Sequence, residues 1–346
     1  MQLQHLTISV LTYVHWLKLT IVVRLIGRRT LIMKITEFCS VWLTVKKRSL
    51  SPTTEQSYAD ALQRVILPFF GDMEIEKITP LDVEMFVAAL YGRNLASETI
   101  RRYLAIFRSM MTKAVTLGLI SGNPAEHGKI EPIRRKEQSF NVLDDVGLMQ
   151  LLSAVDSVEL RWKVYVYFAL DTGARRGECV GLQWKDIQGR EVCIRRSGYK
   201  LTGKPKATKE PKGRRSRKVY VAARTAELLG ALRREQKKNC LKVGKSWKDS
   251  FFVFGDFEEM LHPSSPTSWF SKFLKRHNLP KIRLHDLRHT SATQLLLHGV
   301  DLRTVSGRLG HADLEVTQRY LHFMADADKD AAEKVDLFLY QNKKMV

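Results

Sequence analysis

Apolar residues recur at helical spacing from about residue 35 to residue 122, which predicts a compact bundle of about four helices. The clearest apolar stripe begins at Ser97 and stops at Gly118, a glycine of the kind that ends helices. We expect the stripe to lie in the core, and its members are Ile100, Tyr103, Leu104, Phe107, Met111 and Ala114.

Two start signals divide this helical region. Ser51-Pro52 and Thr79-Pro80 each place a capping side chain before a proline at the first helical position. Asp82 stands in capping-box position after Thr79. We therefore expect helices to begin at both points, as well as at Ser97.

The second half of the chain mixes two periodicities. Helical patterns flank two short β-rich segments, residues 191–197 and 217–223, separated by a stretch rich in Lys, Gly and Pro. This predicts an antiparallel pair joined by a long basic loop. A third apolar segment, residues 251–255, is expected to extend the sheet, and Ser265-Pro266 to start another helix. The predicted fold class is mainly α (α+β): a helical bundle, then a mostly helical domain with a small antiparallel sheet.

The chain divides where the helical periodicity is interrupted. Residues 123–140 hold two prolines and a charged run, and we place a linker at residues 125–140. A helical domain then covers residues 34–124, and a second domain covers residues 141–346.

The composition adds a strong charge to this picture. The formal net charge is +21, and the 44% hydrophobic content supports real cores. Such an excess points to a polyanion, most commonly nucleic acid, against the alternative of a merely basic protein. Four cysteines without C-x-x-C spacing fit reduced thiols in the cytoplasm better than a disulfide framework or a zinc ribbon. The helix expected to begin at Ser97 also carries basic residues outside its apolar stripe, and we expect them to face either phosphates or solvent. They are Arg101, Arg102, Arg108 and Lys113.

Residues 1–33 are apolar and β-branched at first, then basic. His15 and Lys18 interrupt the apolar run, which stays short of the roughly 18 residues of a membrane span. The charges follow the apolar run, whereas those of a signal peptide precede it. We expect an extension with little structure of its own, or an arm that packs on a partner or on DNA, and no membrane association.

Three predicted helices follow one another near the C-terminus. The first covers about residues 284–298 and ends at a glycine. Asp301 caps the second, which ends at Gly310, and Asp313 caps the third.

Side chains suited to a phosphate gather on these helices. His285 and Arg288 are three residues apart and share a helical face, and His311 directly follows the glycine between two helices. Tyr320 lies nine residues beyond His311. Together they predict one cleft in which a tyrosine can attack a bound phosphate.

A metal site is the alternative for the histidines. His285 and His289 have i, i+4 spacing, and His311 offers a third ligand. However, Asp286 stands where the glutamate of H-E-x-x-H would be, and Arg288 would put a cation beside the metal. We therefore expect no metal and no other cofactor.

An arginine pair far upstream completes the set. Thr172-Gly173 breaks an apolar helix, and the next helix opens with Arg175 and Arg176. An arginine near a helix N-terminus suits an anion, and Glu178 is placed to hold an arginine by a salt bridge. The alternative is an arginine that pairs only with surface acids.

Five features now occur in one order: T-G-A-R-R-G-E at 172–178, the basic hairpin, H-D-L-R-H at 285–289, L-G-H at 309–311, and the later tyrosine. In this combination the chain resembles the tyrosine recombinase (phage integrase) family over about residues 35–340. The resemblance implies a core-type, SAM-like DNA-binding domain followed by a mostly helical catalytic domain, which together clamp duplex DNA.

The resemblance also assigns roles. Arg175 matches the first arginine of the family, with Arg176 as its neighbour, and the other matches are His285, Arg288, His311 and Tyr320. The hairpin lysine of the family best matches Lys212, while Lys206 and Lys209 compete for that role.

The implied activity is site-specific cutting and rejoining of DNA in phages and other mobile elements. It would proceed through a 3′-phosphotyrosine and a Holliday junction, without metal or ATP. The implied partners are double-stranded DNA and three further copies in a homotetramer, with room for accessory DNA-bending or directionality proteins. In the family, a helix such as residues 327–341 packs into a neighbouring protomer; the alternative is that this helix folds back on its own domain. The alternatives are a catalytically silent DNA-binding member and an enzyme like type IB topoisomerase, which relaxes DNA.

Overall fold

The computed structural model describes residues 33–134, 141–211 and 216–310, together with Val335 and Leu339. The chain divides into two compact units, residues 1–138 and 139–346, and each has its own hydrophobic core. No helix in these described ranges is long and apolar enough to cross a membrane.

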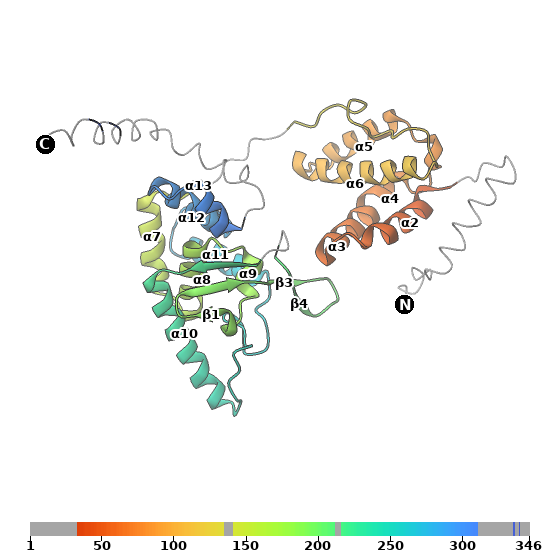
Figure 1. The fold of residues 1–346 in the computed structure, drawn as a ribbon. Helices are drawn as coiled ribbons and strands as arrows, with labels where there is room; N and C mark the ends of the chain where they lie inside the picture. Colours follow the sequence, from red (N-terminus) through yellow and green to blue (C-terminus); the bar gives the residue numbers. More distant parts are fainter. Residues whose placement is uncertain (1–32, 135–140, 212–215, 311–334, 336–338, 340–346) are drawn as a thin grey trace. The chain divides into compact units, whose positions relative to one another are not determined.

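The N-terminal unit is helical (Figure 1). Its main elements are α2 (Ile35–Lys47), α3 (Pro52–Ala61), the π-turn η1 (Leu62–Ile66), α4 (Leu67–Phe70), the 3₁₀ turn η2 (Ile75–Lys77), α5 (Pro80–Gly92) and α6 (Ser97–Thr116). The π-turn ends two residues before Pro68, and the amide of Leu67 donates to the carbonyl of Leu62. Proline removes one helical hydrogen bond and crowds the preceding turn, so a wider turn lets the helix continue.

The start signals of the N-terminal unit are confirmed. Ser51 accepts a hydrogen bond from the amide of Thr54 at the start of α3. Thr79 and Asp82 form a reciprocal capping box, with the Thr79 amide 2.8 Å from a carboxylate oxygen of Asp82. The stripe of α6 is buried as predicted, with Tyr103 only partly covered.

Aromatic rings fill the core of this unit. Phe70 stacks on Phe107 with ring centroids 4.4 Å apart, and Phe86 packs against Phe70 at 5.0 Å. Ala125 is also buried here, and Arg108 donates to its carbonyl oxygen. Arg108 is therefore used to hold this turn against α6.

The C-terminal unit combines helices with two small sheets (Figure 1). Its helices are α7 (Asp145–Val155), α8 (Leu160–Thr172), α9 (Arg176–Val180), α10 (Ala223–Lys242), α11 (Ser265–Arg276), α12 (Asp286–Leu297) and α13 (Leu302–Leu309), with a 3₁₀ turn, η3, at Trp184–Asp186. The strands are β1 (Ile187–Gln188), β2 (Glu191–Ile194), β3 (Ser197–Lys200), β4 (Lys206–Lys209) and β5 (Arg217–Tyr220). Helix α8 packs against both α10 and α12, so it links the sheet side of the unit to the C-terminal helices.

The predicted antiparallel pair is confirmed, because β2 and β5 pair with Val192 opposite Val219. Two related predictions are wrong. The basic loop contains a hairpin of its own, in which β3 pairs with β4. Residues 251–255 do not extend the sheet: Phe252 forms only an isolated bridge with Gln183, Phe251, Val253 and Phe254 are buried, and Val253 donates its amide to the carbonyl of Leu182. A continuous apolar run can fill a core as irregular backbone, and its composition alone does not distinguish the two cases.

Candidate active site

A glycine turn places Arg175 at the start of α9. Helix α8 ends at Thr172, and Gly173 has φ +59°, the left-handed conformation that favours glycine. A Cβ atom on Gly173 would lie 2.3 Å from a methyl group of Leu309. Glycine is therefore required both for the turn and for the close approach of α13.

The two neighbouring arginines lie differently. Arg175 donates through Nη1 to Glu178 at 3.0 Å, and its backbone amide donates to the other carboxylate oxygen at 2.8 Å. Within the described residues, its Nε and Nη2 have no hydrogen-bond partner, and 26% of its side chain is exposed. Arg176 turns instead to the hydroxyl of Thr267 on α11. Arg175 thus lies against Glu178, whereas Arg176 is directed away from that carboxylate toward α11.

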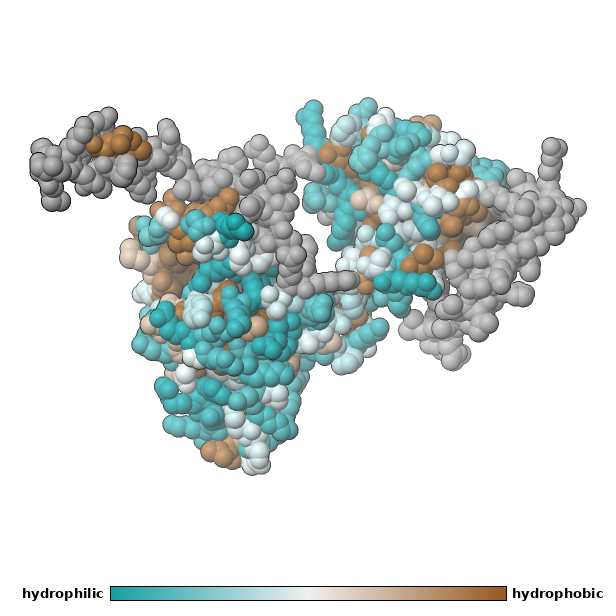
Figure 2. Space-filling model, viewed as in Figure 1, coloured by the Kyte–Doolittle hydropathy of each residue, from teal (hydrophilic) through white to brown (hydrophobic). Residues whose placement is uncertain are grey.

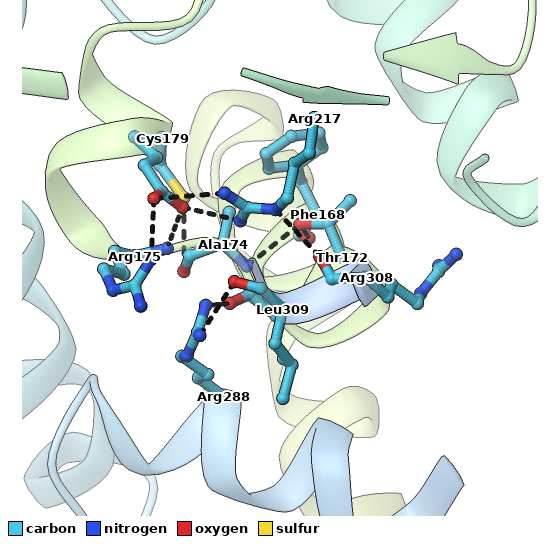
Figure 3. Close-up of polar contacts among 11 residues, drawn as sticks. Phe168, Thr172, Ala174, Arg175, Cys179, Arg217, Arg288, Arg308 and Leu309 are labelled. Atoms are coloured by element: carbon cyan, nitrogen blue, oxygen red, sulfur yellow. Dashed lines mark hydrogen bonds and ion pairs between the residues drawn. The ribbon is translucent and has the colours of Figure 1, made fainter. Parts of the chain in front are cut away.

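Glu178 is the centre of an ion-pair cluster, which confirms the expected salt bridge. Its carboxylate is 1% exposed and receives Nη1 and Nη2 of Arg217 at 3.2 and 2.7 Å (Figure 3). Burial alone would raise the pKa of Glu178. The hydrogen bonds and charges of Arg217 and Arg175 outweigh it and hold that pKa below the usual range.

Arg288 lies on α12 and is 3% exposed. Its Nη1 donates to the carbonyl of Gly173 at 2.6 Å, and its Nη2 to the carbonyl of Leu309 at 2.8 Å (Figure 3). Helix α12 starts at Asp286, directly after His285, and the buried carboxylate of Asp286 accepts the backbone amide of Arg283 at 2.7 Å, which closes the turn before the helix. Arg288 therefore joins the Gly173 turn to the end of α13.

His285 lies beside both arginines and close to His289. Loss of solvent around its ring, and then the charges of Arg288 and Arg175, lower the pKa of His285. The two imidazole rings meet edge to face at 4.9 Å, and burial lowers the pKa of His289 to about 4. Both rings are therefore neutral at neutral pH, and a neutral imidazole can accept a proton.

Helix α13 begins and ends as predicted. The carboxylate of Asp301 accepts the amide of Thr304 at 2.9 Å, and Gly310 closes the helix with φ +68°. Arg308 donates to Asp171 at 2.7 Å, which ties the last turn of α13 to the last turn of α8.

The structure thus brings three of the six predicted site residues together, namely Arg175, His285 and Arg288. The other three, Lys212, His311 and Tyr320, lie outside the described residues.

The two competing lysines both lie on β4. Lys206 pairs with Glu259, and Lys209 lies over the ring of Tyr199, with 5.4 Å from its ammonium nitrogen to the ring centroid. Burial lowers the pKa of Lys209. Neither contact involves Arg175, His285 or Arg288.

The sequence did not reveal two contributors to this site, Arg217 and the pair Arg308–Asp171. Their partners lie far away along the chain, so no local spacing marks them. Among the described residues, no group of three potential metal ligands comes together.

Comparison with known proteins places this geometry in a family. Residues 141–326 match the phage integrase family, and residues 34–91 match the phage integrase N-terminal SAM-like domain. The chain is 30% identical over 310 residues to a tyrosine recombinase of Thermosipho africanus, which covers 87% of this chain and 99% of that protein.

Two solved structures share the fold. The integrase of the transposon Tn1549, in complex with circular intermediate DNA, has a TM-score of 0.74 and 18% identity, covering 88% of this chain and all of that one. A lambda integrase tetramer bound to a Holliday junction has a TM-score of 0.59 and 14% identity, covering 81% of this chain and 78% of that one. The family match spans more than half of the sequence, and the chain belongs to the phage integrase family of tyrosine recombinases, enzymes that break and rejoin DNA.

Proposed function

We propose that Tyr320 cuts one strand of duplex DNA at a specific site and that the resulting 3′-phosphotyrosine is resolved by strand exchange through a Holliday junction. The observation that carries this proposal is the gathering of Arg175, Arg288 and a neutral His285 where α8, α12 and α13 meet. Gly310, the last residue of that junction, directly precedes His311 in the sequence.

The chemistry follows from the residue types. The oxygen of Tyr320 forms a bond to the scissile phosphorus as the bond to the 5′ oxygen breaks, which conserves the phosphodiester energy for rejoining. His285 takes the phenolic proton, and Lys212 gives a proton to the leaving 5′ oxygen. Arg175 and Arg288 hold the non-bridging oxygens. His311 donates a hydrogen bond to the same phosphate.

Arginine keeps its charge at any working pH, so this phosphate clamp needs neither a metal nor ATP. The contacts of Arg288 support its role as a fixed member of the clamp. Two backbone carbonyls from distant segments hold its guanidinium, which leaves it little freedom to reorient when the phosphate changes shape.

We further propose that four copies assemble on DNA, as lambda integrase does in its complex with a Holliday junction. Val335 and Leu339 support this idea, because they are four residues apart and 52% and 46% exposed. Figure 2 shows apolar surface over α7, where Val146 and Met149 are also exposed. Apolar surface of this kind on separate segments suits association between copies.

The test uses covalent capture on DNA. A target site is first selected from a randomised duplex pool as a protein–DNA adduct that survives denaturation, and is then rebuilt as a nicked suicide duplex. The wild-type chain should accumulate the adduct and Tyr320→Phe should form none, because phenylalanine has no nucleophile. Tyr220→Phe is the matched control, since Tyr220 is an exposed tyrosine on β5.

Other outcomes would replace the proposal. If no sequence in the pool forms an adduct with the wild-type chain, the protein binds DNA without cutting it. If adducts form and supercoils relax, but two sites never exchange strands, the enzyme acts like a type IB topoisomerase.

A further inference from the structure

The contacts of Arg217 extend the site beyond the residues that meet the phosphate. Arg217 opens β5, and its side chain is 9% exposed. We infer that Arg217 is a positioning residue, which fixes Arg175 and the end of α13 in one arrangement. This inference rests on the proposed function, because it assigns the purpose of a contact set within that site.

All three nitrogens of the Arg217 guanidinium are engaged. Nη1 and Nη2 bind the two carboxylate oxygens of Glu178, and Nε donates to the carbonyl of Arg308 at 2.8 Å. Glu178 in turn receives the side chain and the backbone amide of Arg175. One guanidinium therefore connects the α9 start to the last turn of α13.

The end of α13 is built to receive this side chain. The last carbonyl groups of a helix have no hydrogen-bond donor within the helix, and here two arginines donate to them. Arg217 takes the carbonyl of Arg308, and Arg288 takes that of Leu309. A Cβ atom on Gly310 would lie 2.9 Å from both Cδ and Nη1 of Arg217. Gly310 thus allows Arg217 to lie against the turn just before His311.

Exposure and charge separate the role of Arg217 from that of Arg175. Arg217 uses all three of its guanidinium nitrogens on the protein and is 9% exposed, whereas Arg175 uses only Nη1 within the described residues and is 26% exposed. Each oxygen of Glu178 is shared between the two arginines, so Arg217 also fixes the rotamer in which Glu178 holds Arg175. Lysine cannot replace it, because an ammonium group lacks the planar fork that makes these three bonds together.

The experiment compares Arg217→Lys and Arg217→Gln with Arg190→Lys and Arg190→Gln in the full chain. Arg190 is a matched control: it lies beside the same sheet, donates to the carbonyl of Val221 and is exposed. The substrate is the nicked duplex selected above. For each variant we measure the DNA dissociation constant, the rate of adduct formation at saturating DNA, and the thermal midpoint.

We expect both Arg217 variants to bind DNA with a dissociation constant within about two-fold of wild type. They should form the adduct roughly 10- to 100-fold more slowly, because small displacements of reacting groups slow a reaction by such factors. The Arg190 variants should react at the wild-type rate. The acid limb of the rate should also shift to higher pH in Arg217→Gln, because buried Glu178 then loses the cation that keeps it ionised. At a temperature at which the variant is still folded, a loss of stability alone would not change the pH dependence of the rate.

A double variant covers the case in which Arg217→Gln folds poorly. Glu178→Gln removes the carboxylate that would be left buried without its partner, so Arg217→Gln with Glu178→Gln should melt higher than Arg217→Gln. It should still cleave slowly, because Arg175 remains unanchored. Wild-type rates in folded Arg217 variants, or a loss explained entirely by weaker DNA binding, would overturn the inference while leaving the proposed function intact. A wild-type chain that forms no adduct overturns both.

Discussion

The two units bury different kinds of residue. Among the described residues of the N-terminal unit, Asn123 is the one buried polar side chain, and the core is otherwise apolar. The described part of the catalytic unit buries eleven polar or charged residues, among them Glu178, Asp186, Asp286 and Arg288. The first unit is therefore held by hydrophobic packing, and the second has charges built into its interior.

Within the described part of the catalytic unit, each buried charge has a partner. Asp286 pairs with Arg283 at 2.8 Å, and Glu178 bonds to two arginines. A buried ion pair contributes little net stability, because desolvation offsets the attraction. The difference between the units teaches that these pairs are kept for the arrangement they impose. They hold cationic groups at a fixed place, as a phosphate clamp requires, whereas apolar packing alone would hold the fold.

The largest effect should come from the apolar core. Phe107→Ala removes a fully buried ring that stacks on Phe70, and should lower the stability of the N-terminal unit by about 3–5 kcal/mol. Hydrogen exchange on the full chain can report each unit separately. Protection should fall in the N-terminal unit and stay unchanged in the catalytic unit.

Leu81→Ala is the control for this change, because Leu81 is 68% exposed in the same unit. Leu81→Ala should change the free energy of unfolding obtained from hydrogen exchange by less than about 0.5 kcal/mol. An equal loss of protection in both units after Phe107→Ala would show that they unfold as one body, and the contrast between their cores would then carry no energetic meaning.

The same contrast explains what the sequence could predict. In the N-terminal unit, the start signals at Ser51 and Thr79 and the α6 stripe act within one or two turns of helix, so local patterns suffice. The break at Gly173 and the cap at Asp301 were predictable for the same reason. The bond from Arg217 to Glu178 and the partners of Arg288 were not predictable, because these contacts join distant segments and the two partners of Arg288 are backbone carbonyls.

The next prediction concerns the stability of the catalytic unit at acidic pH. Folded His289 has a pKa of about 4, whereas an unfolded histidine titrates near 6.5. Between these values the unfolded chain binds a proton that the folded chain does not. The neutral His289 ring therefore contributes on the order of 3 kcal/mol to the free energy of unfolding. This contribution is fully present above about pH 6.5 and is lost as the pH falls toward 4.

Hydrogen exchange at pH 7 and pH 5 should show this loss in the catalytic unit. Burial raises the pKa of Cys39, the buried titratable group of the described N-terminal unit, to about 12, so it stays neutral at both pH values. His289→Gln should reduce the acid sensitivity of the catalytic unit, since glutamine does not titrate. An unchanged pH slope in that variant would assign the sensitivity to other groups.

The smallest effect sharpens the comparison most, because it changes two equivalent helix starts. Thr79→Ala and Asp301→Ala each remove an N-cap, and each should lower stability by about 1 kcal/mol. Their effects on adduct formation at saturating DNA should differ. Asp301 caps α13, whose last turn receives Arg217 and Arg288, so its loss should slow cleavage roughly two- to five-fold. Thr79→Ala should leave that rate unchanged, and Asp301→Asn should restore it because asparagine caps equally well. Equal cleavage rates in Thr79→Ala and Asp301→Ala would mean that the position of α13 does not depend on its cap.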